Sequence, residues 1–251
     1  MPEFPADNFF SDFMVKMIRE HFQYKTTITT IISEKQEYIE AAKTSMVAAR
    51  QEVESEIARE PLFMPAIEPL DLRSCSEIIM KMVNAAFSAG TGPMASVAGT
   101  IAWEGVAAMK RAGAEFAVID NGGDIAVLSE RQVRIGLFCG NADISGKIAF
   151  LVPPKKGIYG ICTSSATVGP SISFGIADSV TVFSENVSLA DAWATALCNI
   201  LTPENADSVL SEITEAGIDG VFVVIGDEIF SWGNVPEVVS AEFDDSLITS
   251  G

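Results

Sequence analysis

Two oxygen-bearing side chains, Asp191 and Thr195, lie four residues apart in the run 190–196, which is otherwise mostly alanine. Alanine favours the helix strongly, so this run predicts a helix. Residues at positions i and i+4 share one helix face, which would place the carboxylate beside the hydroxyl among small side chains. Such hard oxygens suit Mg²⁺, which takes one or two protein ligands and completes its shell with phosphate oxygens and water. The pair therefore predicts a magnesium site.

A second interpretation of Asp191 competes with the first. Ser188 precedes it by three residues, and a Ser-x-x-Asp sequence before an apolar run is a capping box, in which the acid reaches back to the helix start. Caps are common at helix starts. From the residues alone, the helix cap and the metal ligand both remain open for Asp191.

Small residues follow Pro93, which suits the first turn of a helix. Ala95, Ser96, Ala98 and Gly99 occupy the first turns of that predicted helix. Small side chains allow close approach to the backbone, either by a ligand or by a neighbouring helix. Both interpretations remain open.

The segment Asp120, Asn121, Gly122, Gly123 and Asp124 separates two apolar runs. Asn-Gly is a strong signal for the turn of a β-hairpin, and a turn explains most of this segment. Two flanking carboxylates are more than a turn requires. The segment is therefore also a candidate for ligand binding.

A hydroxyl-rich loop spans residues 162–171 and includes Thr163, Ser164, Ser165 and Thr167. Its O–H and N–H groups could bind phosphate or ribose. Loops in general are rich in such residues, so the composition alone favours neither role.

The remaining pattern predicts the elements that position these groups. Alternating β-branched residues predict a strand over 22–32, and apolar residues at helical spacing predict a long amphipathic helix over 34–59. A capping box at Ser74–Glu77 predicts the start of another helix. The further expected elements are strands over 115–119, 125–128, 132–138, 147–152, 158–162, 177–184, 221–225 and 228–231, and helices from 93, over 189–200 and from 202 to about 217.

A weak internal repeat relates residues 116–125 to residues 221–229, each a hairpin with Gly-Asp at its tip and helices before it. We therefore predict an α+β fold of two halves, with antiparallel sheets and helices packed on one face. Two βαβ units with parallel sheets are the alternative. The short hairpin spacing argues against them, because parallel strands need long crossovers.

Composition limits the ligands that this protein can bind. The chain has 251 residues, 48% of them hydrophobic, and a formal net charge of −18, so we expect a substantial core and a surface that repels nucleic acid and anionic membranes. A phosphorylated ligand would need a metal, backbone N–H groups or helix N-termini.

Four scattered cysteines and a single histidine, His21, argue against zinc and iron–sulfur sites. Unpaired cysteines favour a reducing, cytoplasmic location, and neither a signal peptide nor a membrane-spanning run is visible. We expect one domain over 1–251, with an N-terminal arm at 1–14 and a loose acidic tail at 241–251. Open edges of antiparallel sheets make a homodimer plausible.

Four runs together resemble the ApbE-like superfamily, whose best-known members are bacterial flavin transferases. They lie at 92–99 (GPMASVAG), 121–124 (NGGD), 160–169 (GICTSSATVG) and 177–182 (ADSVTV). The resemblance is closest to an uncharacterised branch of that superfamily and covers residues 15–235.

The resemblance implies a specific site in a fold of two T-fold-like halves. Flavin transferases use Mg²⁺ to cleave FAD and place FMN on a protein threonine. By analogy Asp191, Thr195 and the carbonyl of Ala98 would hold the metal. The segments 120–124 and 163–167, with Asp120, Asn121, Gly122, Gly123, Asp124, Thr163, Ser164, Ser165 and Thr167, would lie around FAD or FMN.

Two departures from the transferases concern catalysis. The transferases carry a Lys after the small-residue turn, where this chain has residues 99–101 (GTI), and a His after the hydroxyl-rich loop, where residues 171–176 contain none. Without that histidine the general-base position is empty, although Asp120, Asp124 or Asp178 could serve. Three hypotheses result: a binding protein that keeps the pocket without transfer chemistry, an active Mg-dependent FMN transferase, and a non-catalytic partner-binding protein.

Overall fold

The computed structural model describes residues 17–139, 142, 144–166, 176–214 and 216–241. The predicted arm (1–14), Thr167 and most of the predicted tail lie outside the described residues. Of the tail, only Ala241 is described; it is buried and donates its N–H to the carbonyl of Lys147 at 2.8 Å. None of the described helices is long and apolar enough to cross a membrane.

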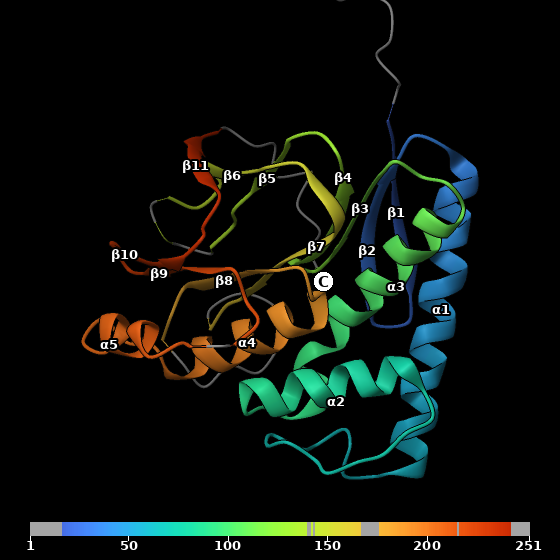
Figure 1. Ribbon diagram of the computed structural model, residues 1–251, viewed down its shortest axis with the longest axis horizontal. Helices are drawn as coiled ribbons and strands as arrows, with labels where there is room; N and C mark the ends of the chain where they lie inside the picture. Colours follow the sequence, from blue (N-terminus) through green and yellow to red (C-terminus); the bar gives the residue numbers. More distant parts are fainter. Residues whose placement is uncertain (1–16, 140–141, 143, 167–175, 215, 242–251) are drawn as a thin grey trace, which may run out of the picture.

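One eight-stranded antiparallel sheet forms the centre of the molecule (Figure 1). Its order is β1 (Ile18–Tyr24), β2 (Thr27–Ser33), β3 (Phe116–Asn121), β4 (Asp124–Ser129), β7 (Lys155–Ser164), β8 (Ser179–Ser184), β9 (Gly220–Ile225) and β10 (Glu228–Gly233). A second sheet has three strands in the order β11 (Glu237–Ser240), β6 (Ile148–Val152) and β5 (Val133–Gly136). Strands β1 and β10 are the edges of the large sheet, and the homodimer through such edges stays a prediction.

The helices come between hairpins of the large sheet. They are α1 (Gln36–Arg59), α2 (Glu77–Ala89), the 3-10 helix η1 (Pro93–Ser96), α3 (Val97–Arg111), α4 (Val187–Ile200) and α5 (Ala206–Ser211). The first half runs β1-β2, helices, β3-β4, and the second runs β7-β8, α4-α5, β9-β10. The predicted α+β class with antiparallel sheets and helices on one face is confirmed, and each half begins with one hairpin more than the repeat alone indicated.

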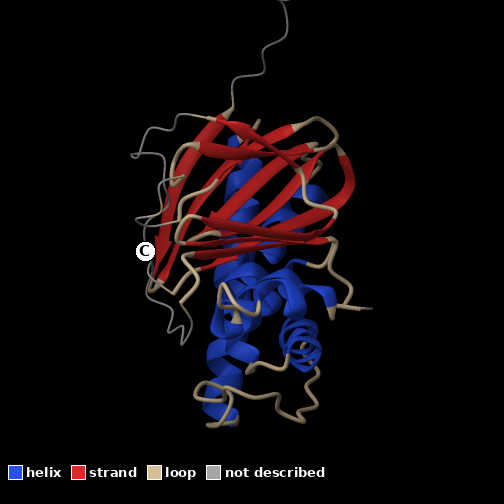
Figure 2. Ribbon diagram, turned by 90° about the vertical axis from the view of Figure 1, so that its left-hand side faces the viewer, coloured by secondary structure: helices blue, strands red, loops and turns tan. Residues whose placement is uncertain are grey.

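Both faces of the central strands are buried. On one face Ala117, Ile119 and Val182 pack with residues of the helices, and on the other Val118 and Phe183 pack with the small sheet. Figure 2 shows the strands together in one part of the molecule with the helices packed against them. Burial on two sides explains why these strands have continuous apolar runs rather than a strict alternation.

Several predicted boundaries are wrong. The strand predicted over 22–32 is the hairpin β1–β2, which turns at Lys25 with a φ of 55°. The helix predicted from 202 to about 217 is the six-residue α5 (206–211). It starts late because the side chain of Asn205 holds a turn by bonding to Thr202 N–H and Ile200 C=O. Strand β11 was not predicted.

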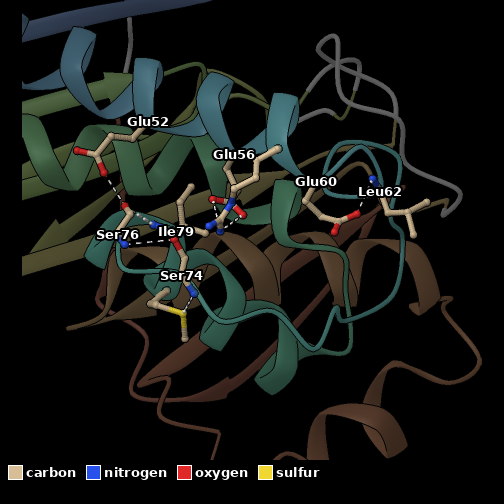
Figure 3. Close-up of polar contacts among 9 residues, drawn as sticks. Glu52, Glu56, Glu60, Leu62, Ser74, Ser76 and Ile79 are labelled. Atoms are coloured by element: carbon tan, nitrogen blue, oxygen red, sulfur yellow. Dashed lines mark hydrogen bonds and ion pairs between the residues drawn. The ribbon is translucent and has the colours of Figure 1, made fainter.

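The capping box predicted at Ser74 is also wrong, because α2 starts two residues later. The N-cap is Ser76, whose Oγ accepts from the N–H of Ile79 at 3.2 Å and donates to Glu52 of α1 at 2.5 Å (Figure 3). Ser74 supports the cap by accepting from the N–H of Ser76 at 3.2 Å.

We expect Ser76→Ala to lower the free energy of unfolding by about 1 kcal/mol, the typical loss on removing a serine N-cap. Ser74→Ala, which leaves the cap oxygen in place, should cost less. Urea denaturation of both variants measures the difference. A larger loss for Ser74→Ala would place the cap at Ser74 instead.

Candidate functional site

The carboxylate of Asp191 does not cap its own helix. The N-cap of α4 is Asn186, whose side chain accepts from the N–H of Leu189 at 3.0 Å. Asp191 is only 6% exposed, and its Oδ2 accepts from the N–H of Gly99 at 2.7 Å. Because Gly99 lies in the first turn of α3, Asp191 places a negative charge at the N-terminus of a neighbouring helix.

Gly99 makes that approach sterically feasible. A Cβ on Gly99 would lie 2.9 Å from the Cβ of Asp191 and 3.1 Å from the carbonyl oxygen of Val187. The small residues after Pro93 thus serve the close packing of α3 against α4, and they also bring the α3 backbone to the Asp191 carboxylate.

The carbonyl of Ala98 lies one residue before this contact and faces the β3–β4 hairpin. It accepts from the side-chain amide of Asn121 at 2.9 Å. Within the hairpin, Asp120 accepts from the N–H of Gly123 at 2.9 Å, and Gly122 and Gly123 have φ of 69° and 103°. The predicted turn is confirmed, and Asn121 ties it to the start of α3.

The hydroxyl-rich segment joins the same hairpin through Thr163. Its N–H donates to the carbonyl of Gly123 at 3.1 Å, and its hydroxyl shares a 2.9 Å hydrogen bond with Thr181. Ser164 ends β7 opposite Val180, and Ser165 is buried beyond it.

Thr195 is the most weakly attached of the predicted metal ligands. It lies one turn after Asp191 on α4 and is partly exposed, and its Oγ1 is 3.5 Å from the carbonyl oxygen of Ala95 in η1. At that distance the hydrogen bond is marginal, so the hydroxyl can exchange this contact for another.

Two of the neighbouring carboxylates are stabilised in their neutral form. Burial raises the pKa of Asp191 to about 7, against the lowering effect of the hydrogen bond from Gly99. The pKa of Asp124 is also raised well above its usual value, first by burial and then by the negative charges of Asp191 and Asp120. Burial, and after it the negative charges of Asp124 and Asp191, raise the pKa of the Cys162 thiol.

No lysine, arginine or histidine in the described part of the chain forms an ion pair with Asp191 or Asp124. Buried charges in proteins are normally paired or bind metals. Two acidic groups therefore lie close together without an ion-pair partner among the described residues.

The donors here suit a hard cation rather than zinc. Among the described residues there is no group of three or more His, Cys, Asp and Glu side chains that could hold a metal. Carboxylate, carbonyl and hydroxyl oxygens are available instead, from Asp191, Ala98 and Thr195. Such a set fits Mg²⁺, with water or phosphate oxygens completing the shell.

A pocket of about 230 Å³ adjoins this cluster, and Ala98 and Asn121 belong to its wall. Its other lining residues come from the β1–β2 hairpin, α1, the loop after α1, η1 and the first half of α3: Thr26, Thr27, Arg50, Val53, Glu54, Ile57, Met64, Met94, Val97 and Ile101. The sequence analysis missed this wall. Val53 and Ile57 belong to the apolar spacing of the predicted helix over 34–59, and no pattern in the sequence marks Arg50 or Glu54 as ligand contacts.

Comparison with known proteins gives one family and a consistent fold. Residues 13–223 match the model of the family AbpE bacteria. Proteins named UPF0280 are similar along nearly their whole length: that of Methanosphaerula palustris is 54% identical, with 94% of this chain and 99% of the relative covered, and that of Methanocorpusculum labreanum is 52% identical, with 94% and 100% covered.

Solved structures of flavin transferases share the fold. The flavin transferase ApbE from Vibrio cholerae has a TM-score of 0.51 at 12% identity, with 86% of this chain and 97% of that chain covered. The ApbE protein from Thermotoga maritima has a TM-score of 0.53 at 13% identity, with 86% and 97% covered. At such low identity the similarity concerns the fold alone.

Proposed function

The chain belongs to the AbpE bacteria family, and from this premise we propose that it binds a flavin nucleotide, or a related phosphorylated ligand, together with a divalent cation at Asp191. The observation that carries the proposal is the buried Asp191 carboxylate, which touches the α3 backbone near a second, partly buried acid, Asp124, and lacks a cationic partner among the described residues. A divalent cation would supply the missing charge.

The negative net charge of the protein supports the proposal that phosphate is bound through a metal ion. With a net charge of −18, the surface repels phosphate groups. A cation bound by protein on one side and by phosphate oxygens on the other overcomes this repulsion, which is the usual arrangement for Mg²⁺.

We assign each of the residues grouped around Asp191 a role in binding either the cation or the ligand. Asp191, Thr195 and the Ala98 carbonyl would hold the cation, whose chemistry is to neutralise charge on the bound phosphate. The hairpin residues Asp120, Asn121, Gly122, Gly123 and Asp124 and the segment with Thr163, Ser164, Ser165 and Thr167 would border the ligand. The contacts of Asn121 with Ala98 and of Thr163 with Gly123 support this grouping.

Binding without transfer is the function that the residues favour. The solved neighbours are flavin transferases by name, but this chain has no histidine in residues 171–176 and no lysine in residues 99–101, where the family pattern has them. The single histidine, His21, is exposed on the edge strand β1. FAD with Mg²⁺ and an acceptor protein should therefore yield no AMP, and sustained AMP release would establish the transferase alternative.

We expect FAD, FMN or ADP to raise the melting temperature of the protein more when Mg²⁺ is present than when it is absent. A ligand at one hundred times its Kd stabilises by about 2.7 kcal/mol, which is several degrees for a chain of this size. Thermal melts with and without EDTA measure the effect, and Asp191→Ala should abolish the dependence on Mg²⁺. No shift with any of these nucleotides would favour the partner-binding hypothesis instead.

A further inference from the structure

The pocket beside Ala98 is lined by chemically different groups. Its walls are mainly aliphatic and thioether side chains, among them Val53, Ile57 and Met94. Ala98 and Asn121, which bond to each other, also belong to the wall. So does Arg50, the one cationic side chain among the described residues that line the pocket; we call Arg50 with its partners Thr27 and Glu54 the Arg50 end.

Arg50 is fixed by its neighbours but not saturated by them. Its Nε donates to Glu54 at 3.0 Å and its Nη1 donates to the hydroxyl of Thr27 at 2.8 Å. A guanidinium has five N–H donors, so three of them have no acceptor in the described part of the chain. The side chain is 20% exposed, which places these donors in a partly dehydrated position.

Lys25 makes this end positive. The two carboxylate oxygens of Glu54 are both engaged, one by Arg50 and the other by the ammonium of Lys25 at 2.6 Å. These cations lower the pKa of Glu54, Lys25 more than Arg50, and keep the carboxylate ionised. Two positive charges therefore surround one negative charge, and this end offers donors rather than acceptors.

We infer that this pocket takes the ring system of the ligand and that Arg50 selects rings with a carbonyl-bearing edge. The inference rests on the proposed function, because the phosphate end of the same ligand would lie at Asp191. A pyrimidine-dione edge, as in a flavin, presents carbonyl acceptors to the free N–H groups of Arg50. The amino group of adenine would present a donor to this donor-rich end. Arg50 is thus a specificity-determining residue.

The size of the pocket agrees with a fused ring. An apolar cavity of roughly 150 Å³ accommodates benzene, and this pocket has about 230 Å³. It is smaller than the roughly 300–1,000 Å³ typical of pockets that enclose a whole drug-sized ligand. The volume therefore suits the dione-bearing end of a fused ring system, with the rest of the rings, the sugar and the phosphates outside.

Riboflavin is the probe that isolates this pocket, because it carries the dione ring and no phosphate. We expect the wild-type protein to bind riboflavin, measured by fluorescence quenching, at least about tenfold more tightly than adenosine. Arg50→Met keeps an unbranched apolar stem and removes the donors, and it should weaken riboflavin binding by about tenfold or more. Arg50→Lys should recover part of the loss, because it restores charge without the planar fork.

Arg59→Met is the matched control, since Arg59 also lies on α1 and pairs with Glu56 but is 57% exposed and outside the pocket. It should bind riboflavin as the wild type does. Thr27→Ala, which removes the hydroxyl that orients Arg50 together with one methyl group, should give an intermediate loss and provides a second test if Arg50→Met does not fold.

Three results would overturn the inference: no riboflavin binding by the wild type, equal binding of adenosine, or unchanged riboflavin binding in both Arg50→Met and Thr27→Ala. Inorganic pyrophosphate with Mg²⁺ tests the site at Asp191 separately, because pyrophosphate has no ring. If the wild-type protein binds riboflavin but not pyrophosphate, the proposed cation site is wrong and the inference about the ring pocket still holds.

Discussion

Asp191→Asn should make the metal-free protein more stable at about pH 8 and insensitive to Mg²⁺. Asparagine keeps an oxygen that can accept from Gly99 N–H and removes the buried charge. Burial raises the pKa of Asp191 from 3.8 to about 7, and each pKa unit corresponds to about 1.4 kcal/mol. The ionised carboxylate therefore destabilises the fold by an amount on the order of 4 kcal/mol, which the variant should regain.

The contribution of Asp191 to the free energy of unfolding changes with pH in a defined direction. For an acid whose folded pKa is raised, the folded state binds more protons than the unfolded state, so stability falls as pH rises from about 4 through about 7. The variant should show a shallower fall, equal stability near pH 4 and its largest advantage above pH 7. Urea denaturation across this range measures it, with Asp227→Asn, an exposed turn residue, as the control for the change of net charge.

Addition of Mg²⁺ should reverse the order of the two proteins. The cation restores stability to the wild type by neutralising the carboxylate, and it has no comparable ligand in the variant. If the variant is less stable than the wild type at pH 8 and responds to Mg²⁺ as the wild type does, Asp191 is a structural cap of α3 and not a metal ligand.

Gly99→Ala should destabilise the protein and weaken its response to Mg²⁺. In an ordinary helix the change from Gly to Ala gains about 1 kcal/mol. Here the new methyl group would meet the Cβ of Asp191 at 2.9 Å and the carbonyl oxygen of Val187 at 3.1 Å, with little room to move. Overpacking of this kind costs about 1–3 kcal/mol, so the steric loss should exceed the helix gain, and Asp191 should shift away from the α3 backbone.

Gly157→Ala provides the matched control, because a Cβ there would meet no atom within 4 Å. Its stability and its Mg²⁺ response should stay close to those of the wild type. If Gly99→Ala were as stable as the wild type and responded fully to Mg²⁺, the close approach of α3 and Asp191 would have no functional role.

The sequence predicted the fold wherever local patterns were strong. The helix over 34–59 and the hairpin at Asn121–Gly123 were recovered because apolar spacing and turn residues mark them locally. The β1–β2 hairpin was missed because its turn contains neither Gly, Pro nor Asn, and the alternation of Phe22, Tyr24, Thr26 and Ile28 continues across it. Strand β11 has only four residues, and its pairing with β6 is a tertiary contact.

The candidate site was also predicted only where a local pattern or the family resemblance marks its residues. The i, i+4 spacing placed Asp191 and Thr195 on one face of α4, and the family resemblance pointed to Ala98. The hydrogen bond from Gly99 to Asp191 joins residues 92 positions apart, so no local pattern could reveal it. The same limit applies to the pocket wall, where Arg50 meets Thr27 across 23 positions.

The most direct test of the cation site is to soak crystals with FMN and with Mn²⁺, which accepts the same oxygen ligands as Mg²⁺, and to locate the manganese ion. We expect an anomalous peak within bonding distance of the Asp191 carboxylate and the Ala98 carbonyl oxygen. A fully soaked crystal with no peak there, or with Mn²⁺ bound only elsewhere, would contradict the existence of a cation site at the start of α3.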